Sequence, residues 1–398
     1  MKYFNTTLNA LFTATLFSLF IYLEYFDITN SWINILAATY ALYRILLRNR
    51  LEVTITGFFI GILWFYWISF SFRFYDLFYL IPFVIIGFGL IYALLFAVLA
   101  YFKNPFYRGI VLVLLSLIEP FNFNWFKVEL LFINTPLSAD IVTLGVMLFL
   151  LALSIRYHKL ILLALPLLLL LPQPTKKDLP NNLNIKIVST DVSQYNKWNP
   201  SFIYKQIKDN LVEIKNAKEQ KYDAVLLPES VFPLYLNKNE KILSALKELS
   251  HSFAIIAGGL YKEDNHVYNA TYFFHDGEMQ IAKKMVLVPF GEYTPLPGFI
   301  RDWINETFFN GAEDYLRANR PTDFIINSHT IRNAICYEAT SKELFQSNPK
   351  IMVAMSNNAW FTPSIEPTLQ KLLLTYYARK FGTIIYHSAN SQGSAIIR

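Results

Sequence analysis

Hydrophobic residues divide this chain of 398 residues into two parts with different patterns. Residues 1 to 172 are almost continuously apolar, whereas residues 175 to 398 combine short apolar runs with ordinary proportions of Lys, Asp, Glu and Asn. A helix needs about 20 apolar residues to cross the hydrocarbon layer of a membrane. The pattern therefore predicts a membrane-embedded first half and a globular second half, and the positive mean hydropathy of +0.32 agrees with this division.

Apolar segments of suitable length predict about seven transmembrane helices in the first half. They lie at 8–26, 31–47, 52–72, 77–101, 106–120, 137–155 and 159–173. The second, fifth and seventh are short, so six spans or a re-entrant segment are the alternatives. The first segment has no small-residue cleavage site and further spans follow it, which argues against a cleaved signal peptide.

Basic residues between these segments predict the orientation, because Lys and Arg near helix ends are retained on the cytoplasmic side. If the N-terminus lies inside, the inside connections hold Lys2, Arg44, Arg48, Arg50, Lys103, Arg108, Arg156 and Lys159, and the outside connections hold Arg73 and Lys127. An odd number of spans then places the globular half in the periplasm of a bacterial cell. The net charge of +6 fits basic residues beside anionic lipid heads and not a nucleic-acid surface.

Glu119 is an acidic residue inside an otherwise apolar stretch. A carboxylate at membrane depth is costly and marks a functional site, whereas one at a helix end near the interface is ordinary. The sequence leaves both alternatives open.

The globular half predicts an α/β fold, because short β-branched runs alternate with polar helical stretches after a linker at 174–183. We expect strands at 184–192, 224–229, 253–260, 269–275, 279–288, 332–338, 351–357 and 383–389, and helices at 201–219, 240–251, 340–347 and 365–381. The glycines of "AGGLY" lack the spacing of a phosphate-binding loop.

Three polar residues stand out near the ends of predicted strands: Glu229, Lys284 and Cys336. Open α/β sheets place their sites at the carboxyl ends of strands. Each residue alone has an ordinary structural explanation, but together they are a base, a cation and a nucleophile. Cys336 is the only cysteine, which excludes an internal disulfide and a multi-cysteine zinc site and leaves packing or nucleophilic chemistry. Strand alternation points Lys283 and Lys284 to opposite faces.

Six short motifs carry a resemblance to a known family. They are "YNKWNP" at 195–200, "LLPES" at 226–230, "KMVLVPFGEYTP" at 284–295, "ICYE" at 335–338, "SNNAWF" at 356–361 and "SANSQGSAII" at 388–397. With the apolar half before them, the chain resembles the apolipoprotein N-acyltransferases, a membrane-bound branch of the nitrilase, or carbon–nitrogen hydrolase, superfamily. The family's Glu-Gly-Arg run and strand arginine are replaced by Lys380, Thr383 and His387.

The resemblance implies an α-β-β-α sandwich over residues 184–398 and a catalytic role for three residues. Glu229 would be the general base, Cys336 the nucleophile that holds the acyl group as a thioester, and Lys284 the cation that stabilises the oxyanion. Glu292 and Glu338 would support them. The substrate-binding candidates are Trp198, Tyr337, Trp360 and Phe361, and an aromatic core is the alternative for the tryptophans and Phe361.

The implied activity is transfer of a fatty acyl chain from a phospholipid to the α-amino group of an apolipoprotein's diacylglyceryl-cysteine, in the inner membrane. We expect no metal, no organic cofactor, no nucleic-acid partner and a monomer. The insertion at 296–320 is expected to be an apolar flap or a surface helix. A membrane-tethered amidase is one alternative. An inactive lipid-binding fragment is another, because the family normally continues into further strands and a last transmembrane helix.

Overall fold

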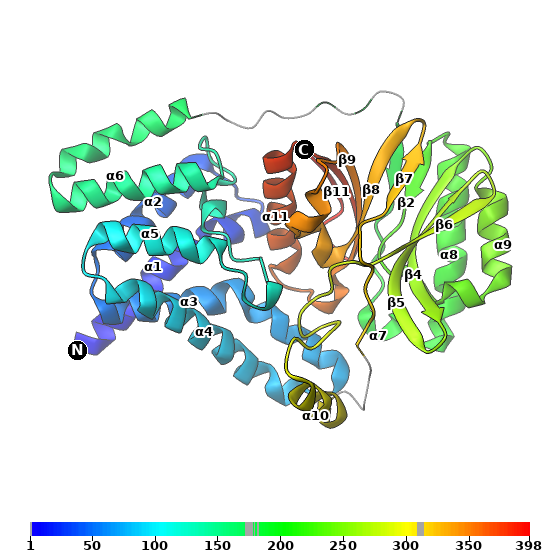
Figure 1. Cartoon of the computed structure of the whole chain (residues 1–398), viewed down its shortest axis with the longest axis horizontal. Helices are drawn as coiled ribbons and strands as arrows, with labels where there is room; N and C mark the ends of the chain where they lie inside the picture. Colours follow the sequence, from blue (N-terminus) through cyan, green and yellow to red (C-terminus); the bar gives the residue numbers. More distant parts are fainter. Residues whose placement is uncertain (1, 172–177, 179, 181–182, 309–313) are drawn as a thin grey trace. The chain divides into compact units, whose positions relative to one another are not determined.

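The computed structural model describes residues 2–171, 178, 180, 183–308 and 314–398. Two compact units are distinguished by their internal contacts (Figure 1). The helical unit contains Met1–Pro120, Asn124–Pro174 and Ser364–Tyr376, and the α/β unit contains Phe121–Phe123, Thr175–Pro363 and Tyr377–Arg398. Most of the linker predicted at 174–183 lies outside the described residues.

The helical unit follows the predicted apolar segments. Its α-helices are α1 (Lys2–Tyr25), α2 (Ser31–Leu47), α3 (Arg50–Phe65), α4 (Ile81–Tyr101), α5 (Pro105–Leu117) and α6 (Ile141–Arg156). Three described stretches are long and apolar enough to cross a membrane, namely Tyr3–Tyr25, Arg50–Tyr75 and Phe78–Tyr101. The described part of the last predicted span forms the 3₁₀ helix η5 (Lys159–Leu170), which contains Pro166. The number of spans stays a prediction.

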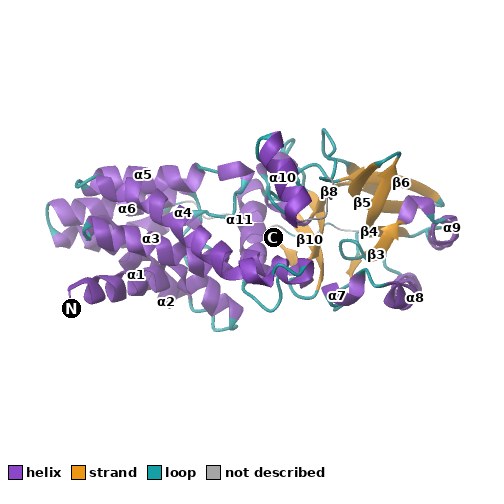
Figure 2. Cartoon of the chain, turned by 90° about the horizontal axis from the view of Figure 1, so that it is seen from below, coloured by secondary structure: helices purple, strands orange, loops and turns teal. Residues whose placement is uncertain are grey.

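Helices α3 and α4 lie side by side and approach closely at two glycines of α3 (Figures 1 and 2). A Cβ atom on Gly57 would lie 2.5 Å from the carbonyl oxygen of Tyr92, and one on Gly61 would lie 2.5 Å from the carbonyl oxygen of Phe88. The two glycines are four residues apart, so they share one face of α3. This small-residue spacing is typical of helix pairs that pack backbone to backbone in membranes.

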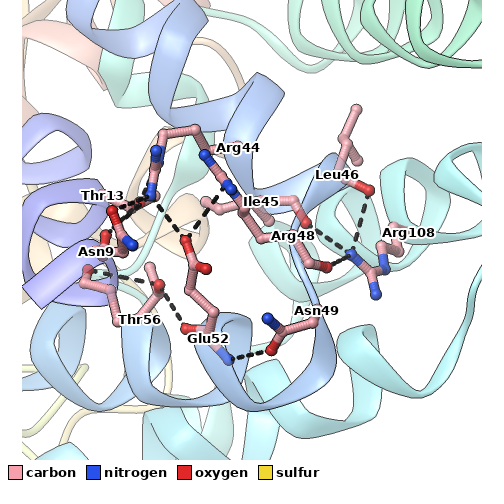
Figure 3. Close-up of polar contacts among 11 residues, drawn as sticks. Asn9, Thr13, Arg44, Ile45, Leu46, Arg48, Asn49, Glu52, Thr56 and Arg108 are labelled. Atoms are coloured by element: carbon pink, nitrogen blue, oxygen red, sulfur yellow. Dashed lines mark hydrogen bonds and ion pairs between the residues drawn. The ribbon is translucent and has the colours of Figure 1, made fainter. Parts of the chain in front are cut away.

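Two buried arginines of the helical unit, Arg44 and Arg108, are paired with a carboxylate or with main-chain carbonyls (Figure 3). The Nη2 atom of Arg44 lies 2.7 Å from Oε1 of Glu52, and its Nε donates to Thr13 at 2.7 Å. Arg108 donates to the carbonyl oxygens of Ile45 and Leu46 at the end of α2. An arginine near a helix C-terminus also complements the helix dipole.

Glu119 lies just beyond the end of α5, with its carboxylate 3.0 Å from the ammonium of Lys127. The structure therefore supports the helix-end alternative for this residue. The pairing gives the carboxylate a structural explanation without a catalytic role.

The α/β unit contains two sheets. The six-stranded sheet has the order β1 (Ile185–Ile187), β2 (Ala224–Leu226), β4 (Ala254–Glu263), β5 (His266–His275), β6 (Glu278–Lys283), and β3 (Phe232–Tyr235) pairs with β4. The five-stranded sheet has the order β11 (Ala395–Ile397), β10 (Ile384–Asn390), β9 (Ile351–Asn357), β8 (His329–Ile335), β7 (Asp323–Ile326). β1, β2 and β4 are parallel, as are β8, β9 and β10.

The two sheets pack face to face, and helices cover the other face of the larger sheet (Figure 2). One apolar cluster joins residues of both sheets; in it the rings of Phe273 and Phe324 stack with centroids 4.5 Å apart. A second cluster packs the larger sheet against α8 (Pro200–Glu219) and α9 (Glu240–Leu249). The predicted α/β fold is confirmed.

Some element predictions were wrong. The helix expected at 340–347 is instead two 3₁₀ turns, η7 (Cys336–Thr340) and η8 (Lys342–Phe345). Ser341 between them has an extended backbone, φ −102° and ψ 132°, which interrupts the helix. The described part of the insertion contains α10 (Gly298–Phe308), which exposes Phe299 and Trp303. A role of α10 as a flap stays a prediction.

Candidate active site

Glu229 follows β2 and is held by an amide from a neighbouring strand. Its carboxylate Oε1 accepts a hydrogen bond from Nδ2 of Asn269 at 2.7 Å. Asn269 is buried on β5, and the same nitrogen donates to Oε1 of Glu292 at 3.2 Å. One amide therefore fixes two carboxylates, and it donates to them without adding charge.

Lys284 directly follows β6, and its side chain is only 1% exposed. Its ammonium lies 2.7 Å from Oε2 of Glu292 and 4.0 Å from Oε1 of Glu229. Burial disfavours the charged ammonium, but Glu292, Glu229 and Cys336 outweigh burial and raise the pKa of Lys284 well above its usual value. Lys284 is thus a permanent buried cation at neutral pH.

The neighbouring Lys283 has a different environment, as strand alternation predicts. Its ammonium forms an ion pair with Glu263 at 2.7 Å and lies over the ring of Tyr268. The assignment of Lys284, and not Lys283, to the buried cluster is therefore consistent with the structure.

The loop after Lys284 folds back to deliver Glu292. Its carboxylate Oε2 accepts from the backbone N–H of Val288 at 2.9 Å, and Phe290 between them has φ +60°. The "LVPFGEY" stretch is thus a compact turn whose acidic side chain pairs with Lys284, three residues before the stretch begins.

Cys336 follows β8 and opens η7, with a half-buried side chain. Its φ is +53°, a left-handed backbone that non-glycine residues rarely adopt. Such strain of about 1–3 kcal/mol is concentrated at active sites, where the surrounding structure enforces it. Its sulfur is close enough to Lys284 to favour the charge of that ammonium. The same cation favours a thiolate over a thiol.

Glu338 joins the nucleophile turn to the strand end that carries Lys284. Its carboxylate accepts from the backbone N–H groups of Met285 at 2.8 Å, Val286 at 3.1 Å and Ile335 at 2.7 Å. Burial raises its pKa to about 7, against the opposing effects of Lys284 and these three donors. Glu338 therefore connects the two halves of the site through main-chain bonds.

Tyr337 is buried and contacts a short segment from a distant part of the sequence. Its hydroxyl donates to the carbonyl oxygen of Asn122, and its ring stacks on Phe123 with centroids 6.2 Å apart. The loop that carries Glu292 also contacts this segment. The ring of its Phe290 lies edge to face with the ring of Phe121. Residues 121–123 thus pack beside the nucleophile and the Glu292 loop.

The remaining predicted residues lie at ends of elements of the same unit. Trp198 is 38% exposed and follows α7 (Gln194–Lys197), while Trp360 and Phe361 are half-buried after β9. Their substrate-binding role stays a prediction.

Sequence reasoning missed two contributors to the cluster. Asn269 is predicted only as the first residue of a strand at 269–275. A polar residue at the start of an apolar strand could have indicated a site residue. Residues 121–123 carry no such signal, because their contacts with Tyr337 arise only in the folded chain.

Comparisons with known proteins agree with these observations. The model of the apolipoprotein N-acyltransferase integral membrane domain matches residues 4–173. The chain is 44% identical to the apolipoprotein N-acyltransferase of Wolinella succinogenes over 393 residues, which are 98% of this chain and 95% of that protein. It is 37% identical to that of Helicobacter pylori, again over 98% of this chain and 95% of the relative.

Solved structures give a distant match. A CN-hydrolase superfamily protein from Xanthomonas campestris is 14% identical with a TM-score of 0.39, over 53% of this chain and 76% of that one. Yeast Nit3, of the nitrilase superfamily, is 17% identical with a TM-score of 0.39, over 52% and 75%.

The apolar helices, the two packed sheets and the similar proteins together define the class of protein: a membrane-bound acyltransferase with an α/β second half. The similarity to the two relatives, which extends over 98% of this chain, is more specific. The chain belongs to the apolipoprotein N-acyltransferase family.

Proposed function

We propose that this protein transfers a fatty acyl chain from a phospholipid to the α-amino group of the diacylglyceryl-cysteine of apolipoproteins. The observation that carries the proposal is the buried group of Glu229, Lys284 and Glu292 beside a strained Cys336, in a chain of this family. The reaction has two halves that share one thioester.

In the first half-reaction, Glu229 takes the proton of the Cys336 thiol and the thiolate attacks an ester carbonyl of the phospholipid. Lys284 stabilises the oxyanion of the tetrahedral intermediate. The intermediate collapses, the carbon–oxygen bond to the glycerol breaks, and the lysophospholipid leaves with the proton from Glu229. The acyl chain remains on Cys336 as a thioester.

In the second half-reaction, the α-amino group of the acceptor attacks the thioester carbonyl. Glu229 takes a proton from the attacking nitrogen, and Lys284 again stabilises the oxyanion. Breaking the carbon–sulfur bond releases the amide product, and the proton returns to the Cys336 sulfur. No group beyond the chain and its two substrates is needed for proton or electron balance.

The proposal includes a location and partners. The excess of basic residues in alternate connections supports an inner-membrane protein with its α/β unit in the periplasm. Its partners would be the phospholipid donor and the apolipoprotein acceptor, and it would act as a monomer.

The experiment is intact-mass measurement of the purified full chain after incubation with phospholipid and no acceptor, with and without neutral hydroxylamine. The wild type should gain one hydroxylamine-labile acyl chain. Cys336→Ala should gain none, and Lys284→Ala should gain it at least about 100-fold more slowly because the oxyanion loses its cation. Lys283→Ala is the matched control, since its ammonium pairs with Glu263 outside the site, and should behave like the wild type.

Absence of the adduct from a folded wild-type protein would contradict the proposal. If the adduct forms but water releases it as fast as an added diacylglyceryl-cysteine peptide does, the chain is a membrane-tethered hydrolase instead.

A further inference from the structure

Lys197 is a buried cation beside the site that the mechanism above does not use. It ends α7, its side chain is among the largest that are fully buried, and the whole residue is 2% exposed. Its ammonium donates to the main-chain carbonyl oxygen of Glu229 at 3.0 Å. A lysine side chain is almost never fully buried unless its ammonium is paired with another polar group.

The carbonyl that Lys197 contacts belongs to a strained turn. Ser230, directly after Glu229, has φ +48°. Behind the turn, a Cβ atom on Gly258 would lie 2.4 Å from the Ser230 nitrogen and 2.8 Å from the Glu229 Cα. The peptide group between Glu229 and Ser230 therefore packs closely against Gly258, and its carbonyl oxygen accepts a hydrogen bond from the Lys197 ammonium.

Helix α8 fixes both ends of this link. Gln206 donates from Nε2 to the carbonyl oxygen of Lys197 at 3.1 Å, and Asn210 donates from Nδ2 to the carbonyl oxygen of Val231 at 2.8 Å. Gln206 and Asn210 are four residues apart, so they lie on one face of α8. Two neutral amides of α8 thus hold the main chain at Lys197 and at Val231, the two ends of the link.

The charge balance of the site gives the lysine a second effect. Three carboxylates, Glu229, Glu292 and Glu338, surround one ammonium, that of Lys284. Burial lowers the pKa of Lys197 to about 8, and Glu229 acts in the opposite direction, so Lys197 is mainly protonated at pH 7. Lys197 is therefore a second buried cation that interacts with the base.

We propose that Lys197 is a positioning residue for Glu229: it fixes the peptide after the base, and its positive charge attracts the Glu229 carboxylate while Cys336 is activated. The inference rests on the proposed function, because it assigns Lys197 a part in thioester formation.

The test compares Lys197→Met, which removes both donor and charge, with Lys197→Gln, which keeps a donor and removes the charge. Lys218→Met is the matched control, because its ammonium also donates to a main-chain carbonyl, that of Leu249 at 2.8 Å, but away from the site. The measurement is the rate of thioester formation on the full chain against pH, with phospholipid and no acceptor, together with the thermal unfolding midpoint.

Lys197→Met should form the thioester about tenfold or more slowly at pH 7, the scale of a lost hydrogen bond from a charged group. Lys197→Gln should shift the acid limb of the rate profile to higher pH, because a carboxylate without its neighbouring cation holds a proton more strongly. A purely structural lysine would not move that limb. The other titratable groups near the base, Lys284, Glu292 and Glu338, are the same in every variant.

A Lys197→Gln profile that overlays the wild type in rate and in acid limb would overturn the inference. This outcome remains decisive if Lys197→Met fails to fold. Failure of the proposed function is a different result, because then the wild type itself forms no thioester.

Discussion

Cys336 occupies a backbone conformation that costs energy, and Glu338 two residues later helps to hold it. The carboxylate of Glu338 accepts from the N–H of Ile335, directly before the cysteine, and from two N–H groups after Lys284. Each such bond to a charged group contributes about 1.5–3 kcal/mol. A single acidic side chain thus offsets the strain of the nucleophile turn and sets its separation from the buried cation.

The residue scale also predicts a pH dependence of stability through His387. This histidine is buried on β10, where Nδ1 donates to the carbonyl oxygen of Gly393 at 2.9 Å and Nε2 accepts from the hydroxyl of Ser356 at 2.8 Å. Burial lowers its pKa to about 4, although the Gly393 bond acts in the opposite direction. The unfolded chain, with a His pKa near 6.5, therefore binds the proton first as the pH falls.

The free energy of unfolding should decrease as the pH falls from 6.5 to 4, by roughly 3 kcal/mol from this residue. Thermal unfolding followed between pH 4 and 7 should show a steeper acid decline for the wild type than for His387→Gln, whose side chain does not titrate. Parallel declines would show that His387 is not the source.

Sequence could predict the reactive groups of the site but not what holds them. Glu229, Lys284 and Cys336 each follow a strand, so the rule on carboxyl ends of strands was enough to select them. Asn269 and Lys197 act through contacts with Glu229 from 40 and 32 positions away. Such pairs are visible only after the chain has folded, because no local pattern shows which distant residue each side chain will contact.

At the scale of elements, the close contact of α3 with α4 depends on glycine. Gly61→Ala should lower the thermal unfolding midpoint, because the new Cβ would lie 2.5 Å from the Phe88 carbonyl oxygen and overpacking costs about 1–3 kcal/mol. Gly87→Ala is the control on α4, since nothing lies within 4 Å of its Cβ position. An equal effect of the two substitutions on the midpoint measured in detergent would contradict this packing argument.

Strands and helices with a strong pattern are predicted from sequence, whereas three of the short strands are missed. The expected strand at 351–357 coincides with β9, and the helix at 201–219 with α8 to within one residue. The strands β3, β7 and β11 have only three or four residues each, too few for an alternating pattern to stand out. For the turns at 336–345 the sequence predicts the end of a strand at 338 and a helix from 340, because a left-handed residue such as Cys336 has no signal in composition.

At the scale of the whole molecule, the distribution of Lys and Arg predicts the orientation in the membrane, with the N-terminus inside and the α/β unit in the periplasm. It is tested in a Cys336→Ala background by single cysteines at Tyr204, which is 79% exposed on α8, and at Lys103, which is exposed between α4 and α5. A maleimide that cannot cross membranes should label Tyr204→Cys and not Lys103→Cys in intact bacterial spheroplasts. Labelling of Lys103→Cys alone would reverse the orientation.

The single cysteine of the chain allows the acylated fraction of the protein to be measured by counting free thiols. Cys336 is the only thiol among 398 residues, so under the proposed mechanism a free thiol in a pure sample marks a protein without an acyl chain. The fraction that fails to react with a small thiol reagent after denaturation is then the fraction that carries an acyl chain. Titrating the protein directly from its native membrane would therefore show which half-reaction limits the flow of acyl groups in the living cell.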